Sequence, residues 1–280
     1  MKNFVIIANP GKEGSFEKSR SIMELLKSRG CTCTAALMSE ESSGKPYLYT
    51  DPALVPKGTE AVLSLGGDGT MIHAAKDLLP LNLPVFGINF GTLGYLTESS
   101  ADDFGVALDE IVAGNYEIEE RMLLEADICK EGKVTGTGLA LNDIVINRSL
   151  ATGIAQLDVE IDGHFLNSYS ADGMIISTPT GSTGYNLSAG GPVVLPTGEL
   201  VLITPICAHT LNSRSVVLPG DIEIRVTCHR NQVSYVTIDG EKGIELSQGD
   251  SIVARKADRS VKIIKINRSS FIENLGKKMR

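Results

Sequence analysis

The first part of the chain alternates short apolar runs with amphipathic segments. Apolar runs over residues 4–8, 31–37, 61–65 and 84–89 predict strands. Between them, apolar residues recur at helical spacing in a segment that ends near Arg29, in residues 71–79 and in residues 102–113. Strands that alternate with helices indicate a parallel sheet covered by helices. We therefore expect an N-terminal α/β domain with a Rossmann-like parallel sheet.

From about residue 121 the pattern changes to strict alternation of apolar and polar positions. Leu157, Val159 and Ile161 alternate with acidic residues, and the run ends at Asp162-Gly163, a hairpin signal. Residues 222–227, 233–239 and 251–254 predict further strands, and no long amphipathic helix is predicted between 121 and 258. The C-terminal domain is therefore expected to be mostly β.

These patterns give the expected domain limits. Residues 1–118 form the α/β domain and residues 119–259 the β-rich domain. Residues 261–266 are expected to form a last strand, so that the tail from about 260 to 280 packs back on the first domain. Residues 39–57 are rich in Ser, Pro and Gly and predict a loop, and the basic residues 277–280 predict a solvated tail.

Composition narrows the class of partner. A chain of 280 residues allows one large or two modest domains. Its net charge of −8 argues against a nucleic-acid partner, which needs a basic face, but not against small anionic ligands. The five cysteines include no CxxC pair and predict reduced thiols in a cytoplasmic protein. No run approaches the ~20 apolar residues of a membrane span, so we expect no membrane partner.

The turn Gly66-Gly67-Asp68-Gly69-Thr70 directly follows the apolar run 61–65 and precedes a predicted helix. Glycines let backbone amides approach a phosphate closely, and a strand, a glycine turn and a helix N-terminus together form an anion site. A carboxylate would repel phosphate, so Asp68 indicates a role with a hydroxyl nucleophile or a magnesium ion. The alternative is a tight turn in which Asp68 caps the helix.

The second polar segment covers residues 172–191. An apolar strand over residues 174–177 leads into a loop dense in hydroxyls and glycines, which suits a ligand with many acceptors such as a nucleotide. Tyr185 would either stack on a ring or fill the core. The alternative for the whole segment is a surface loop rich in Gly and Ser.

Two shorter polar signals stand near other predicted strands. Asn142-Asp143 interrupts the apolar run 139–146, and an unpaired buried amide or carboxylate costs a few kcal/mol. A structural hydrogen bond would account for one of the two side chains, and a bound polar ligand for both. Asp239-Gly240 follows the strand residues 235–238 and by itself indicates a hairpin turn.

Together these segments resemble the NAD kinase family. The resemblance covers residues 60–240 and includes, in the family's order, residues 66–70, 89–97, 142–143, 172–191, 205–214 and 239–240. It implies that ATP phosphorylates the 2′-hydroxyl of the adenosine ribose of NAD, giving NADP and ADP, with Mg²⁺ or another divalent cation as cofactor. It also implies a homodimer or homotetramer whose site residues are shared between subunits.

The resemblance assigns roles to single residues. Asp68 would contact the ribose hydroxyl as base or orienter, and is a possible metal ligand. Asp172 would lie near the nicotinamide half of NAD, and Asp239 near the reacting ribose. The residues implied in binding NAD are Gly67, Asp68, Gly69, Tyr95, Asn142, Asp143, Asp172, Thr180, Thr183, Gly184, Tyr185 and Asp239.

The chain departs from the family pattern at two positions. Gly184 stands where many members have Ala, and the missing methyl group would loosen packing on the adenine. Phe90 stands where many members have Arg or Thr. Among the histidines, only His209 falls inside a matching segment.

Two other functions stay open at this point. A lipid or sphingoid kinase shares the glycine turn but needs an apolar slot, whereas the distinctive loop here is rich in hydroxyls. A non-catalytic dinucleotide-binding protein would tolerate loss of Asp68, which is present.

Overall fold

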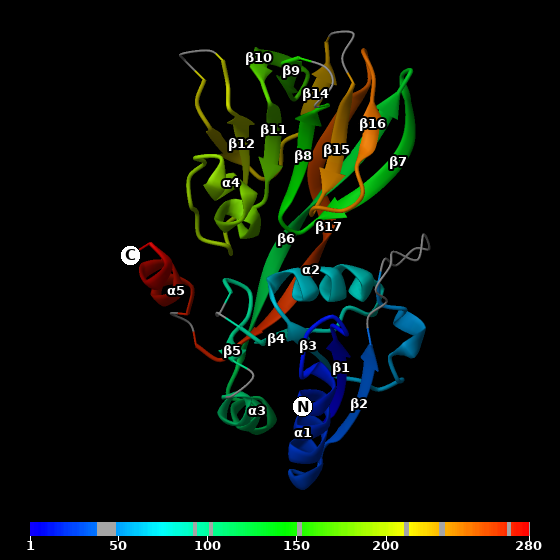
Figure 1. The fold of residues 1–280 in the computed structure, drawn as a ribbon, viewed down its shortest axis with the longest axis vertical. Coiled ribbons are helices and arrows are strands. Elements are labelled where there is room, and N and C mark those ends of the chain that lie inside the picture. Colours follow the sequence, from blue (N-terminus) through cyan, green and yellow to red (C-terminus); the bar gives the residue numbers. More distant parts are fainter. Residues whose placement is uncertain are drawn as a thin grey trace. The chain divides into compact units, whose positions relative to one another are not determined.

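The computed structural model (Figure 1) describes residues 1–37, 49–91, 94–100, 103–149, 153–209, 213–229, 233–267 and 270–279. The chain divides into two compact units. The first unit contains Met1–Glu120 and Val261–Arg280, and the second contains Arg121–Ser260. The first is α/β and the second is mostly β, so the predicted fold class is confirmed.

The first unit is built on a parallel sheet. Its strands are, in spatial order, β2 (Thr32–Leu37), β1 (Asn3–Ala8), β3 (Ala61–Gly66) and β4 (Val85–Asn89). On the far side of β4, the short strand β5 (Ser99–Ser100) and Ile263 of β17 (Ser251–Lys265) pair with it, also in parallel. Both faces of this sheet are covered, and for this reason the apolar residues in β1, β3 and β4 form continuous runs.

Helices cover the two faces of this sheet. Apolar side chains of α1 (Ser15–Ser28) and α3 (Phe104–Ala113) share one core with alternate residues of β1, β3 and β4, such as Ile6 and Phe86. On the other face, α2 (Asp68–Asp77) packs on β3 and β4, and its Met71 lies against Gly87. None of the helices in the described ranges is long and apolar enough to cross a membrane.

The second unit contains two sets of antiparallel strands around one core. One sheet has the order β13 (Val216–Pro219), β12 (Leu200–Ile206), β11 (Gly173–Ser177), β8 (Asp143–Arg148), β15 (Ser234–Ile238) and β16 (Ile244–Leu246). The other strands are β10 (His164–Ala171), β9 (Ala155–Ile161), β14 (Ile224–Cys228), the first part of β17, β6 (Glu117–Lys130) and β7 (Lys133–Ala140).

The predicted hairpin of the second unit is present. Asp162 and Gly163 both have positive φ, 48° and 74°, as a two-residue turn between twisted strands requires. Ile161 pairs with His164 across this turn, and Leu157 and Val159 point into the core.

Three expectations for local structure need correction. Residues 251–254 and 261–266 are not separate strands, because β17 runs unbroken from Ser251 to Lys265. The polar residues between them hide the strand in the sequence, and the first of them is held by ion pairs: Arg255 contacts Glu125 and, at 2.7 Å, Asp127 on β6. The helix expected at 71–79 begins earlier, at Asp68.

The third correction concerns the C-terminus. Residues 277–279 are exposed, as expected, but they do not form an irregular tail, because α5 covers Ser270–Lys278 and packs within the first unit. Arg280 and residues 39–48 of the expected loop lie outside the described residues, and Pro52–Leu54 of that loop form a 3-10 turn.

A buried ion pair closes the first unit. Lys265, at the end of β17, contacts Glu98, and their side chains are only 3% and 1% exposed. Glu98 also lies in the main-chain segment directly before β5, where its amide donates to the carbonyl of Gly87 at 3.0 Å. The pair therefore joins two segments distant in the sequence.

We predict that Lys265→Met lowers the free energy of unfolding by about 3–5 kcal/mol, because it leaves the Glu98 carboxylate buried without its lysine. The matched control is Lys256→Met on the same strand, whose partner Glu199 is 71% exposed. That change should cost no more than about 1 kcal/mol. Urea unfolding followed by circular dichroism measures both, and equal midpoints for the two variants would contradict the prediction.

Candidate active site

A cavity of about 760 Å³ lies at the carboxyl edge of the parallel sheet in the first unit. Ligands of open α/β sheets bind at this edge, beyond the ends of the strands. The lining comes from the segments that follow β1, β3 and β4 and from α5: Lys12, Glu13, Gly14, Gly67, Asp68, Asn89, Phe90, Gly91, Gly94 and Lys278.

Asp68 lies in this cavity and its carboxylate is held by backbone amides. Tyr95 N donates to Oδ2 at 2.8 Å, while Leu96 N and Thr97 N donate to Oδ1 at 3.2 and 3.3 Å. The Thr97 hydroxyl lies 3.4 Å from Oδ1. Asp68 is also the first residue of α2, where a negative charge favours the helix dipole. The carboxylate is therefore fixed in direction, and Tyr95 reaches the site through its main chain.

Close packing explains two of the glycines around Asp68. A Cβ added to Gly94 would overlap the Asp68 carboxylate, and one added to Gly66 would overlap the Thr70 side chain. Gly67 and Gly69 differ, because a Cβ at Gly67 would come no closer than 3.8 Å to Asn89 Oδ1 and one at Gly69 would meet no described atom within 4 Å. The N-terminus of α2 is therefore open to a ligand at Gly67 and Gly69.

The sequence analysis missed the cationic residues of this cavity. Lys12 lies in the segment after the buried strand β1 of the same parallel sheet, and this position in the sequence could have placed it at the cavity. Lys278 comes from α5, and its Nζ lies 4.1 Å from the centroid of the Tyr95 ring. Phe90 lines the cavity with an apolar ring where the resemblance led us to look for Arg or Thr.

In the second unit, strand direction brings three polar segments to one end of the six-stranded sheet. Asp143 begins β8, and both neighbours of β8 are antiparallel to it. The end of β11, at Ser177, therefore pairs with Asp143, and the end of β15 pairs with the residue that follows. Residues 178–185 and Asp239 come directly after those two strand ends.

Hydrogen bonds join these segments. The main-chain amide of Thr178 donates to the carbonyl of Asn142 at 2.9 Å, and the Thr178 hydroxyl donates to the carbonyl of Leu141 at 2.5 Å. Asp239 has a left-handed φ of 49°, and its carboxylate accepts the amides of Leu141, Asn142 and Asp143 at 2.7–3.1 Å. Asp239 is thus more than a hairpin turn, because it holds the Asn142-Asp143 segment in place.

The same end of the sheet carries buried polar atoms without partners. Among the described residues, Asn142 Oδ1 and Thr180 Oγ1 are buried and have no hydrogen-bond partner. A Cβ on Gly184 would lie 3.6 Å from Asn142 Nδ2 and 4.0 Å from Asp143 Oδ2, so Gly184 borders both side chains. Orphaned buried acceptors and hydroxyls are costly, and a polar ligand would satisfy them.

Thr183 and Tyr185 lie on the short helical segments beside this cluster. The Thr183 hydroxyl lies 3.4 Å from the carbonyl of Thr180 in the 3-10 turn Thr180–Thr183. Tyr185 begins α4 (Tyr185–Ser188) and is 43% exposed, so it does not fill the core.

Asp172 lies away from this cluster. It precedes Gly173, the first residue of β11, whereas residues 178–185 follow the last. Its carboxylate accepts a hydrogen bond from Arg148 Nε at 2.6 Å. The structure therefore brings Asn142, Asp143, Thr180, Gly184 and Asp239 together at one end of the sheet and leaves Asp172 at the other. His209, whose amide donates to the carbonyl of Ser170 at 2.8 Å, is close to the Asp172 end.

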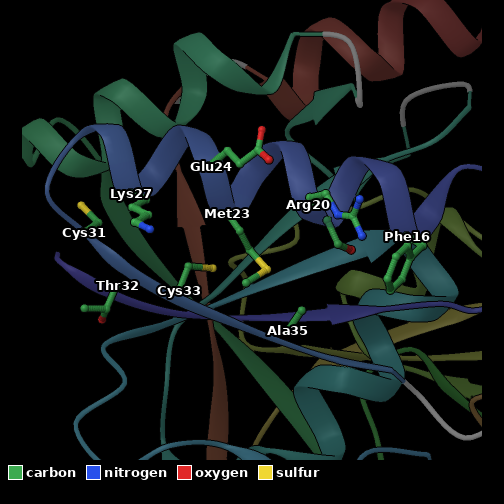
Figure 2. A pocket seen from close by; sticks show the side chains of 10 residues that line it. Phe16, Arg20, Met23, Glu24, Lys27, Cys31, Thr32, Cys33 and Ala35 are labelled. Carbon is green, nitrogen blue, oxygen red and sulfur yellow. The ribbon is translucent and has the colours of Figure 1, made fainter.

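A larger cavity of about 840 Å³ lies between α1 and β2 and contains none of the predicted site residues (Figure 2). Met23 from α1 and Cys33 from β2 point toward one another inside it. Burial, with a smaller contribution from Cys31, raises the pKa of the Cys33 thiol to about 12. The thiol therefore stays protonated at neutral pH and is a poor nucleophile.

Family models match both parts of the chain. Residues 4–116 match the ATP-NAD kinase N-terminal domain, and residues 141–266 match the ATP-NAD kinase C-terminal domain. An NAD kinase of Lachnospira eligens is 40% identical over 293 residues, covering 100% of both chains. One from Agathobacter rectalis is 42% identical over 285 residues, covering 100% of this chain and 99% of its own.

Solved structures show the same fold. The NAD kinase of Archaeoglobus fulgidus in complex with ATP superposes with a TM-score of 0.76 at 26% identity, covering 98% of each chain. Yeast NADH kinase complexed with NADH gives a TM-score of 0.84 at 24% identity, covering 99% of this chain and 87% of that one.

Proposed function

The chain belongs to the ATP-NAD kinase family, and on that premise we propose that it transfers the terminal phosphoryl group of ATP to the 2′-hydroxyl of the adenosine ribose of NAD, giving NADP and ADP. The observation that carries the proposal is the fixed Asp68 carboxylate at an open helix N-terminus, inside a cavity lined by lysines. Family membership argues against the lipid kinase and the non-catalytic binding protein.

The donor side needs charge neutralisation more than covalent chemistry. The N-terminus of α2, where the space beside Gly67 and Gly69 is open, and Lys12 offer positive potential to the phosphates of ATP. In the described ranges, no three His, Cys, Asp or Glu side chains are grouped so as to hold a metal ion. Because Mg²⁺ is usually held by one or two carboxylates together with substrate phosphates, we propose that this ion, or another divalent cation, arrives with ATP, with Asp68 as a possible ligand.

The acceptor side depends on Asp68. A carboxylate oxygen offers two lone pairs, and Oδ2 accepts one backbone amide while Oδ1 accepts two amides and faces the Thr97 hydroxyl. Oδ2 is thus proposed to accept a hydrogen bond from the ribose 2′-hydroxyl. As the new P–O bond forms and the bond to ADP breaks, the hydroxyl proton passes to Asp68.

Binding of NAD is assigned to the polar cluster of the second unit. The unpartnered Asn142 Oδ1 and Thr180 Oγ1 suit the hydroxyl and amino groups of a nucleoside, and Asp143 and Thr183 add further partners. The exposed ring of Tyr185, beside the small residue Gly184, suits stacking on adenine. Asp239 is proposed to act through the main chain of residues 141–143 and so to be a positioning residue.

Asp172 supports the proposal of a site shared between subunits. It lies at the opposite end of β11 from the Asn142 cluster, so one copy of this sheet does not bring both to one nucleoside. We propose a homodimer or homotetramer in which the neighbouring subunit supplies Asp172. The proposed location is the cytoplasm, in keeping with five free cysteines.

We predict that Asp68→Asn lowers kcat by about 10²–10⁴-fold, because general-base help and positioning of the hydroxyl contribute that much. The assay is NADP formation from NAD, ATP and Mg²⁺, and the control is Asp109→Asn, a carboxylate on α3 outside the cavity. Rescue by excess Mg²⁺ would assign Asp68 to metal binding, and a kcat near that of the unmodified enzyme would remove it from the mechanism.

We predict that Asn142→Ala raises the KM for NAD about tenfold or more and leaves the KM for ATP unchanged, because a hydrogen bond to the ligand is lost in a buried site. Thermal unfolding should change little, since Asn142 Oδ1 has no partner in the described chain. Asn115→Ala, at the end of α3, serves as the control. A lower Tm with an unchanged KM would show that the pair is structural.

We predict that mixing two inactive variants restores activity. Asp68→Asn and Asp172→Ala subunits, dissociated and reassembled together, should form mixed oligomers in which some sites combine an intact Asp68 with an intact Asp172. NADP formation above that of either variant alone, together with light scattering above the monomer mass, checks this. A fully active monomer would refute the shared site.

A further inference from the structure

We propose that α5 is part of the nucleotide site, and that Lys278 binds a phosphate group in the Asp68 cavity. The proposal rests on the function proposed above and names a residue that the sequence analysis had treated as part of a solvated tail. It also gives α5 a second role, that of supporting the segment which holds Asp68.

One face of α5 packs on the segment that carries Gly94 and Tyr95. Phe271, Asn274 and Lys278 recur at spacings of three and four and therefore share a helix face. The Phe271 ring lies 6.1 Å from the Tyr95 ring, and the buried Asn274 donates from Nδ2 to the carbonyl of Gly94 at 3.3 Å. The helix is therefore held by a hydrogen bond and by an apolar contact.

Lys278 completes this face at the cavity. Its Nζ lies 4.1 Å from the centroid of the Tyr95 ring, and the residue lines the cavity together with Gly67 and Asp68. No ion pair joins Lys278 to a carboxylate within the part of the chain that the structure describes, although Glu13 and Asp68 line the same cavity. An ammonium group held by an aromatic face beside an open helix N-terminus is suited to a phosphate oxygen.

The contacts also connect α5 to the reacting carboxylate. The Gly94 carbonyl accepts from Asn274, and the next amide, Tyr95 N, donates to Asp68 Oδ2 at 2.8 Å. The main chain between these two hydrogen bonds is a single peptide unit. A shift of α5 would therefore move the amide that orients the carboxylate.

Two substrates could supply the phosphate: the triphosphate of ATP or the diphosphate of NAD. The position of Lys278 beside the N-terminus of α2 favours ATP. The experiment separates the two by measuring the KM for each substrate.

The test compares Lys278→Met with Lys277→Met in the full-length enzyme. Methionine keeps an apolar stem over Tyr95 and removes the charge. Lys277 and Lys278 are both exposed neighbours on α5, but only Lys278 lines the cavity. We expect Lys278→Met to raise the KM for ATP about tenfold or more, as loss of a charge-assisted hydrogen bond requires. Lys277→Met should stay within about twofold of the unmodified enzyme, and Lys278→Arg should restore most of the affinity.

A binding measurement keeps the test independent of turnover. Calorimetric titration with MgATP, and with inorganic tripolyphosphate, should show the same loss of affinity in Lys278→Met without NAD. This result would stand even if the enzyme formed no NADP, so failure of the proposed function and failure of this inference are distinguishable. A rise in the KM for NAD alone would assign Lys278 to the diphosphate of NAD.

Unchanged affinity for both substrates and for tripolyphosphate would overturn the proposal. A fall in both kcat and Tm with unchanged KM values would also overturn it, because this result would mark Lys278 as purely structural.

Discussion

In each unit, the polar cluster depends on the same interaction, a carboxylate that accepts consecutive backbone amides. Asp68 accepts the amides of residues 95–97, and Asp239 accepts those of residues 141–143. In each case one short side chain fixes the direction of three peptide groups. Both carboxylates follow a strand directly or within two residues, so the sheets position them and the carboxylates position the loops.

This arrangement reconciles an acidic protein with anionic substrates. The net charge of −8 gives no general attraction for phosphates. The attraction has to be local, and in the cavity of the first unit it comes from the open N-terminus of α2 and from the lysines that line the cavity. The amides of residues 95–97 orient Asp68, and the space beside Gly67 and Gly69 at the start of α2 stays open.

Local patterns predicted β1 to β4, α1 to α3 and the Asp162-Gly163 hairpin, because each depends on neighbouring residues. The Asn142-Asp143 pair could also be recognised in the sequence as a candidate site, since its two polar residues interrupt an apolar strand. The remainder depends on contacts that no local pattern records. Lys278 reaches the cavity only because α5 packs on Tyr95, and the separation of Asp172 from Asn142 follows from the direction of β11. The length of β17 was hidden because its polar middle is stabilised by charges on another strand.

The buried pair of Lys265 and Glu98 has a consequence for how the chain folds. The partners are 167 residues apart in sequence, and the whole second unit lies between them. The first unit therefore closes a very long loop before Glu98 is neutralised and before β17 lines up beside β4. Contacts of such sequence separation slow folding. An N-terminal fragment, although it contains β1 to β4 and Asp68, would carry an exposed sheet edge and a carboxylate without its lysine, so the second unit acts as an insertion that the first must accommodate during folding.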